Sequence, residues 1–234
     1  MHRVLAIRPR HREPAALHES AYNELLEYLG RDVAGRRARP TDDLSSVIAN
    51  GHMDGAPMAM LETLSYLMIA ATAGHETASS AIAGGMLALM QNPDQMRLLR
   101  ERPELWKTAA EEVVRWVTPA RHQMRTATCD YVLRGQQIRK GDSLAMYYLS
   151  ANRDEDVFEH PFRFDATRPV GKHLAFGIGT HLCLGRPLAL MEIRTFFAQL
   201  LARLEHIELV SEPVWVESNF VTGLKRMEAS YRMN

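Results

Sequence analysis

The chain has 234 residues, of which 46% are hydrophobic and 24% charged, a composition typical of a globular protein and not of a disordered one. Its 28 Lys and Arg residues balance its 28 Asp and Glu residues, so the charge favours neither a nucleic-acid partner nor an anionic membrane. Two cysteines, Cys129 and Cys183, exclude a disulfide framework, and the simplest interpretation of either is a reduced, buried thiol.

The sequence shows no pattern for export or membrane insertion. Residues 1–14 are too basic, and their apolar run is too short, for a signal peptide. The most apolar stretch, residues 64–73, is about half the length that a bilayer span needs. We therefore expect a soluble cytoplasmic protein.

Helices dominate the first half of the chain. Residues 13–29 carry one apolar stripe, and Gly30 is expected to end that helix. A basic turn over 35–40 precedes a short helix that is capped at 41–43 and runs through Ala49, and residues 50–57 form turns. A long helix over 58–91 is apolar on most sides, which predicts that it lies in the interior. Two more helices are expected over 93–100 and 103–117.

Short strands follow the helices. Residues 122–149 are expected to form strands, with a hairpin turn at Arg134-Gly135. Residues 150–169 are rich in loops, residues 186–204 form a helix, and the tail over 207–231 forms a small terminal sheet. The order predicts a mainly α protein with small β-sheets, an α+β arrangement.

One glycine-rich loop surrounds a single cysteine, in the sequence HLAFGIGTHLCLGRP at 173–187. Its pattern is Phe176-x-x-Gly179-x-x-x-Cys183-x-Gly185, and glycines let the backbone approach a large flat group closely. Backbone N–H groups of the turn and of the following helix would stabilise a thiolate. The loop is therefore suited to present a cysteinate to a planar group such as haem. Taken alone, it is more typical of a small buried cysteine beside a turn.

Two further patterns place polar groups among apolar ones. The sequence AGHET at 73–77 puts Glu76 and Thr77 inside the long helix, either as a functional polar notch or as a polar pair that faces another helix. Glu112 and Arg115 share a helix face at a spacing of three residues. They are either a solvated surface pair or, given their apolar neighbours, a buried pair that needs further partners.

Together these patterns resemble the C-terminal part of a bacterial cytochrome P-450, the cysteinate-haem monooxygenase family. AGHET resembles its oxygen-activation helix, EEVVR its Glu-x-x-Arg pair, and FGIGTHLCLG its haem-binding motif. RTATCDYVLRGQQIRKGD resembles the haem-flanking sheet, and DVFEHPFRFDATR the meander region. The resemblance begins near Tyr22 and implies the cytochrome P-450 fold with its N-terminal part missing.

The resemblance divides the chain, as the C-terminal part of one domain, into five segments. Residues 1–57 would hold the leading helices, 58–119 the long central helix and those after it, 120–170 the sheet and meander, 171–205 the haem-ligand loop and its helix, and 206–234 the terminal sheet. The implied cofactor is haem b, iron protoporphyrin IX.

The resemblance also assigns roles to single residues. Cys183 matches the axial iron ligand, and His181 and Arg125 match the partners of the haem propionates. Phe176 matches the aromatic residue that shields the sulfur, within a loop shaped by Gly177, Gly179 and Gly185.

Thr77 matches the threonine that helps deliver protons to dioxygen, and Glu76 matches its acidic neighbour. Glu112 and Arg115 match a structural pair whose third partner is Arg163 or His173. The implied lining of the substrate pocket is Ala70, Ala73, Gly74, Ala120, Phe220 and Val221.

The implied reaction inserts one oxygen atom of O2 into a hydrophobic small molecule such as a terpenoid, a steroid or an aromatic compound. The chain has no flavin or nicotinamide motif, so the electrons would come from a separate ferredoxin and its NAD(P)H-dependent reductase. Lys172, Arg186 and Arg194 are candidates for docking the ferredoxin, although a solvated basic face is the slightly favoured interpretation. The alternative function is a truncated haem-binding fragment without turnover.

Overall fold

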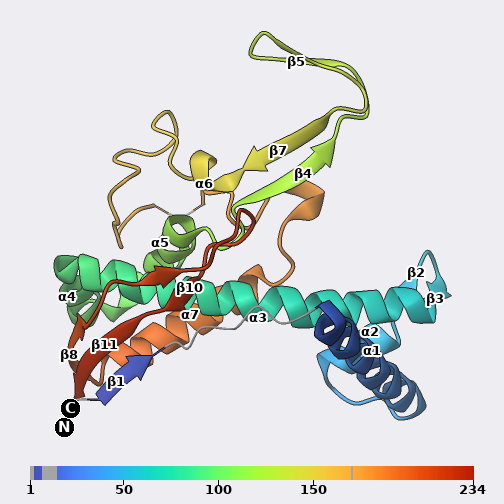
Figure 1. Cartoon of the computed structure of the whole chain (residues 1–234), viewed down its shortest axis with the longest axis horizontal. Coiled ribbons are helices and arrows are strands. Elements are labelled where there is room, and N and C mark those ends of the chain that lie inside the picture. The colour runs from blue at the N-terminus through green and yellow to red at the C-terminus, as the bar shows by residue number, and fades with distance from the viewer. Residues whose placement is uncertain (1–2, 7–14, 170) are drawn as a thin grey trace. The chain divides into compact units, whose positions relative to one another are not determined.

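The computed structural model describes residues 3–6, 15–169 and 171–234, and is mainly helical with small antiparallel sheets, as expected (Figure 1). The chain divides into two compact units, one of Met1–Pro9 with Thr77–Asn234 and one of Arg10–Glu76. Within the described ranges, no helix combines the length and apolarity that crossing a bilayer demands.

The smaller unit holds two helices, a short hairpin and the first half of a third helix. Its elements are α1 (Ala15–Ala38), α2 (Leu44–Ala49), β2 (His52–Met53), β3 (Ala56–Pro57) and the start of α3 (Met60–Gln91). Asp43 caps α2 as expected, because its side chain accepts a hydrogen bond from the amide of Ser46 at 2.8 Å. Arg37 ties the unit together through the carbonyls of Ala49 and Met58 at 2.8 and 2.9 Å.

The prediction that Gly30 ends the first helix is wrong. α1 continues to Ala38, so most of the expected basic turn is helical. A glycine inside a helix costs only about 1 kcal/mol, and that of Gly30 is outweighed here by the burial of Leu29 and Val33 on the same helix. Of the expected helix, residues 13 and 14 lie outside the described residues, as do all but 3–6 of the opening segment 1–14.

The long helix α3 begins two residues after its predicted start and ends at the predicted residue, Gln91. Its second half is buried, with Ala88 and Leu89 fully enclosed in the main core. The expectation that the whole helix lies in the interior is wrong, because Leu61 is 77% exposed and Ile69 is 64% exposed. The hydrophobic pattern alone could not show that the side chains of Leu61 and Ile69 stay uncovered by the described residues.

The core of the larger unit lies among four helices. They are the second half of α3, α4 (Pro93–Glu101), α5 (Trp106–Val117) and α7 (Arg186–Leu201), with a short 3-10 turn, η1 (Pro103–Leu105), before α5. Trp106 of α5 stacks on Phe197 of α7 with the ring centroids 5.0 Å apart. Gly85 lets α3 pack closely against α5 and α7, since a Cβ there would lie 2.8 Å from a methyl group of Val113 and 3.1 Å from the Phe197 ring.

Small antiparallel sheets complete the larger unit. Their strands are β1 (Arg3–Ala6), β4 (His122–Thr126), β5 (Tyr131–Leu133), β6 (Gln136–Ile138), β7 (Ser143–Tyr147), β8 (Leu204–Leu209), β9 (Val214–Trp215), β10 (Leu224–Arg226) and β11 (Glu228–Met233). β11 pairs with β1 and β8, β9 with β10, β4 with β7, and β5 with β6. The β5–β6 hairpin extends from the end of the β4–β7 pair (Figure 1). Arg134 and Gly135 have positive φ in its turn, as the expected hairpin requires.

Irregular chain fills much of the interval between β7 and α7, as expected. Its described residues form only a helical turn, α6 (Tyr148–Ala151), and a 3-10 turn, η2 (Gly179–His181). Several side chains of α5 help to fix this segment.

Candidate active site

The loop that carries Cys183 is held by its own backbone. The amide of Cys183 donates to the carbonyl of Phe176, and the amide of Gly177 donates to the carbonyl of Leu174, both at 2.8 Å. Gly177 and Gly179 have φ of +71° and +67°, a region that disfavours other residues. A Cβ on Gly177 would lie 2.9 Å from the carbonyl oxygen of His181, so this turn needs glycine twice over.

The thiol of Cys183 is exposed at the start of a helix. The simplest interpretation of the two cysteines, that they are buried, is wrong, because Cys129 and Cys183 are both exposed. Gly185 is the N-cap of α7, so the thiol lies where backbone N–H groups favour a thiolate. Large apolar side chains are exposed on both sides of it, with Ile178 75% exposed and Leu184 90% exposed.

Two side chains that can bind carboxylates, Arg125 and His181, belong to the same unit as this loop. Arg125 lies on β4, is half-buried, and donates from Nη1 to the carbonyl of Met124 at 2.8 Å. His181 is exposed in η2, two residues before Cys183. A sulfur donor, exposed apolar side chains and two residues that bind carboxylates are the chemistry that fits a flat apolar group with acidic substituents, such as a haem.

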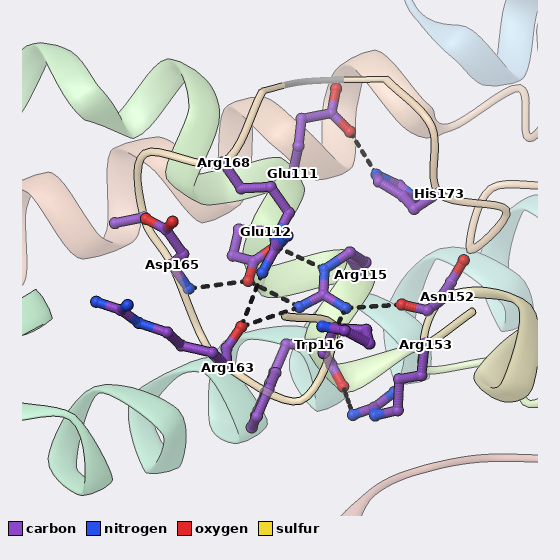
Figure 2. Close-up of polar contacts among 12 residues, drawn as sticks. Glu111, Glu112, Arg115, Trp116, Asn152, Arg153, Arg163, Asp165, Arg168 and His173 are labelled. Atoms are coloured by element: carbon purple, nitrogen blue, oxygen red, sulfur yellow. Dashed lines mark hydrogen bonds and ion pairs between the residues drawn. The ribbon is translucent and has the colours of Figure 1, made fainter. Parts of the chain in front are cut away.

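Behind the loop, Glu112 and Arg115 form a buried ion pair on α5 (Figure 2). Nε of Arg115 donates to Glu112 Oε2 at 2.7 Å, and Nη2 donates to Oε1 at 2.8 Å. The other Arg115 donors reach the carbonyls of Asn152, Pro161 and Arg163 at 2.7, 3.0 and 3.4 Å. All five N–H donors of this guanidinium are thus used, which is what a fully buried cation requires.

The third partner of this pair is Arg168, so the prediction of Arg163 or His173 is wrong. Nε of Arg168 donates to Glu112 Oε2 at 3.0 Å, while its Nη atoms donate to the carbonyls of Glu159, His160 and Arg163. Arg163 contributes only its backbone carbonyl to the two guanidinium groups (Figure 2). The sequence offers several basic residues in one loop, and only the path of that loop selects among them.

The sequence analysis also missed Glu111, a buried carboxylate that holds both ends of the Cys183 loop. Its Oε2 is 2.8 Å from His173 Nε2, and its Oε1 accepts from Arg186 Nη2 at 2.9 Å. Burial favours the neutral acid, but the hydrogen bonds from His173 and Arg186 outweigh it and lower the pKa of Glu111. The only sequence signal was a second acid beside Glu112, which by itself predicts nothing.

The remaining candidate residues are divided between the two units. Ala120 pairs with Val221 through an isolated β-bridge, and the amide of Arg121 donates to the carbonyl of Phe220 at 2.8 Å, so these segments lie together in the larger unit. Ala70, Ala73 and Gly74 are exposed on α3 in the smaller unit. Glu76 and Thr77 are half-buried on the same helix, one in each unit.

A model of the family described as Cytochrome P450 matches residues 12–227 of the chain. The chain belongs to the cytochrome P450 family. This P450 is 42% identical over 201 residues to Cytochrome P450-terp of a Pseudomonas species, a match that covers 86% of the chain and 47% of that relative. It is also 42% identical over 192 residues to linalool 8-monooxygenase of Pseudomonas putida, with 82% and 47% covered. It thus spans about half the length of the curated relatives it matches.

Solved structures agree with the family. The crystal structure of a P450 from Novosphingobium aromaticivorans aligns with a TM-score of 0.87 at 43% identity, over 92% of this P450 and 52% of that chain. The chain therefore has the P450 fold, as the resemblance implied, and family membership implies a haem group. The residues that would hold it are Cys183, Arg125 and His181, whose chemistry fits as described above.

Proposed function

We propose that this P450 provides the haem-thiolate centre of a monooxygenase. The net reaction combines O2, two electrons, two protons and a C–H bond to give an alcohol and water. The single observation that supports this most is Cys183, an exposed thiol at a helix start, held by its amide to the Phe176 carbonyl at 2.8 Å and flanked by exposed apolar side chains. Haem b, when bound, supplies the oxygen activation, and donation from a cysteinate favours cleavage of the O–O bond.

The residues of the chain then have separate tasks. Cys183 provides the sulfur ligand, and Phe176 is the proposed aromatic shield of that sulfur. Arg125 and His181 pair with the two propionates. Gly177, Gly179 and Gly185 keep the loop narrow enough for a planar group to approach its backbone.

Thr77 and Glu76 are proposed to deliver the protons that one oxygen atom needs in order to leave as water. Both are half-buried on α3, so each is positioned by a helix rather than by a loop. We expect Thr77→Ala to retain haem binding but to divert electrons from product to hydrogen peroxide. Unchanged coupling of electrons to product would contradict this role.

The proposed substrate is a hydrophobic small molecule, either a terpenoid, a steroid or an aromatic compound. The relatives include a linalool 8-monooxygenase and, at 38% identity, a steroid C26-monooxygenase of Rhodococcus jostii. Ala120, Phe220 and Val221, which lie together in the larger unit, are proposed to line its apolar pocket, and Ala70, Ala73 and Gly74 stay a prediction from the resemblance.

The proposed electron donors are a ferredoxin and its NAD(P)H-dependent reductase, in the cytoplasm. Among the three docking candidates, Lys172 is exposed. Arg186 is 35% exposed and bound to Glu111, and Arg194 donates to the carbonyl of Lys107 at 3.4 Å. Lys172 is therefore the candidate with its charge most available to an acidic partner.

A haem-binding fragment without turnover is the second candidate, since the chain spans about half of its curated relatives. The test is to supply haem, reduce with dithionite, add carbon monoxide and record the difference spectrum. A red-shifted Soret band that is lost in Cys183→Ser and kept in the matched control Cys129→Ser supports the cysteinate centre. A band typical of thiol or histidine ligation, or none, refutes it. Product formation with ferredoxin, reductase and substrate then separates the enzyme from the fragment.

A further inference from the structure

Glu111 connects the two ends of the Cys183 loop through a closed set of contacts. His173 lies at the beginning of the loop and Arg186 directly after it, and both bind the same carboxylate. The amide of Ala175 donates to Nδ1 of His173 at 3.3 Å, so Nδ1 is an acceptor and Nε2 is the ring atom that donates to Glu111. The carboxylate therefore accepts one hydrogen bond from each end of the loop.

Both partners of Glu111 also contact Phe176. The His173 ring centroid is 5.8 Å from that of Phe176, and the Arg186 guanidinium lies 5.7 Å from the centroid of the same ring. The Phe176 carbonyl in turn accepts the amide of Cys183 at 2.8 Å. Glu111 is thus linked to Cys183 by three successive contacts: its carboxylate binds His173 or Arg186, that side chain contacts the Phe176 ring, and the Phe176 carbonyl accepts the Cys183 amide.

The surroundings of Glu111 give this carboxylate no other role in the described part of the chain. The residue is 4% exposed, so a charge there is costly unless it is bonded. Its neighbour Glu112 points to the separate network of Arg115 and Arg168. The two acids are adjacent, and each serves a different segment.

From these contacts we infer that Glu111 is a positioning residue for the cysteinate loop: it fixes His173 and Arg186, which hold Phe176 and, through its carbonyl, Cys183. The inference rests on the proposed function only in naming Cys183 as the ligand. It is tested without haem, so its failure is distinct from a failure of the Cys183→Ser experiment.

The test is hydrogen exchange of the full chain, read by mass spectrometry over peptides that cover 174–183, α5 and α7. Glu111→Gln leaves a side chain of the same shape, but its amide NH2 faces either His173 or Arg186, both donors. We expect exchange over 174–183 to be faster by about tenfold or more, with α5 and α7 unchanged, because a hydrogen bond to a charged group contributes on this scale. Glu104→Gln is the matched control, since Glu104 pairs with Arg102 at 3.0 Å on the surface.

Three further variants keep the inference open to refutation. Arg186→Gln removes one arm and should increase loop exchange on its own. His173→Gln, which can still donate to Glu111, should restore the protection that His173→Ala loses. In the haem-supplied chain, Glu111→Gln should also weaken the red-shifted carbon monoxide band.

Wild-type exchange over 174–183 in Glu111→Gln overturns the inference. So does an equal loss of protection throughout α5 and α7, because Glu111 would then belong to the core and not to the loop. If Glu111→Gln does not fold, wild-type loop exchange in Arg186→Gln overturns it as well.

Discussion

Substitution of Glu112 by glutamine tests the buried network most directly. The carboxylate accepts four hydrogen bonds, two from Arg115, one from Nε of Arg168 and one from the amide of Asp165 at 2.9 Å. Four is about the full capacity of a carboxylate. Glutamine can satisfy the donors at only one of its two terminal atoms, and its amide NH2 meets donors at the other.

The cost follows from these contacts. About two hydrogen bonds to a charged group are lost, each contributing about 1.5–3 kcal/mol. Arg115 also keeps its charge in a site where its side chain is 1% exposed. We expect the free energy of unfolding to fall by about 3–5 kcal/mol, the range for breaking one side of a buried ion pair. A domain stability of about 5–15 kcal/mol makes such a loss easy to measure.

The assay is urea unfolding, followed by tryptophan fluorescence, because Trp116 lies beside the pair and 5.9 Å from the Arg115 guanidinium. Glu205→Gln is the matched control. Glu205 also binds an arginine through two hydrogen bonds, at 2.6 and 2.9 Å from Arg232, but on the surface. A loss below about 1 kcal/mol in Glu112→Gln, or one no larger than in the control, would refute the reasoning from burial.

Three smaller predictions follow from single positions. Gly30→Ala should stabilise the chain by about 0.5–1 kcal/mol, since nothing lies within 4 Å of the added Cβ. Gly85→Ala should destabilise it by about 1–3 kcal/mol, since its Cβ would lie 2.8 Å from a methyl group of Val113. Urea unfolding measures both changes. Gly177→Ala, with φ of +71°, should cost about 1–3 kcal/mol and lower haem uptake. Gly35→Ala is the control that should leave haem uptake unchanged, since Gly35 lies outside the loop and nothing is within 4 Å of its added Cβ; uptake by both variants at a fixed haem concentration decides this. The pKa of the Glu111 carboxylate is lowered in the folded chain, so its stabilising contribution is complete above its ordinary pKa of 4.5. That contribution is lost as the pH falls through the lower folded pKa. Glu111→Gln should therefore lack this part of the acid sensitivity that the wild type shows.

The sequence was sufficient where local chemistry decides the structure. Asp43 caps α2 because a carboxylate there can accept the amide of Ser46, and Gly135 marks the hairpin turn because glycine readily adopts the positive φ that the turn requires. The pairing of Glu112 with Arg115 follows from their spacing on one helix face. None of these features depends on a distant segment.

The sequence failed where a distant segment decides. Arg168 lies 56 residues from Glu112 in the sequence. The expected partners Arg163 and His173 also carry hydrogen-bond donors, so residue type does not select among the three. The carbonyls that satisfy Arg115 belong to loops without periodicity, so no pattern could identify them. The exposed half of α3 has the same cause, because apolar periodicity marks a surface that can be buried and does not name what buries it.

The position of the candidate site is therefore set by α5 rather than by the loop that carries the sulfur. Adjacent residues on an α-helix point about 100° apart, so Glu111 and Glu112 address two different segments from one turn. Glu112 and Arg115 hold the irregular chain at 152–168 by its backbone, and Glu111 holds the ends of the Cys183 loop by two side chains. Changes in the two acids should consequently separate, with Glu112 governing the stability of the whole unit and Glu111 governing the order of one loop. Equal effects of the two substitutions on both observables would mean that α5 supports a single undivided network.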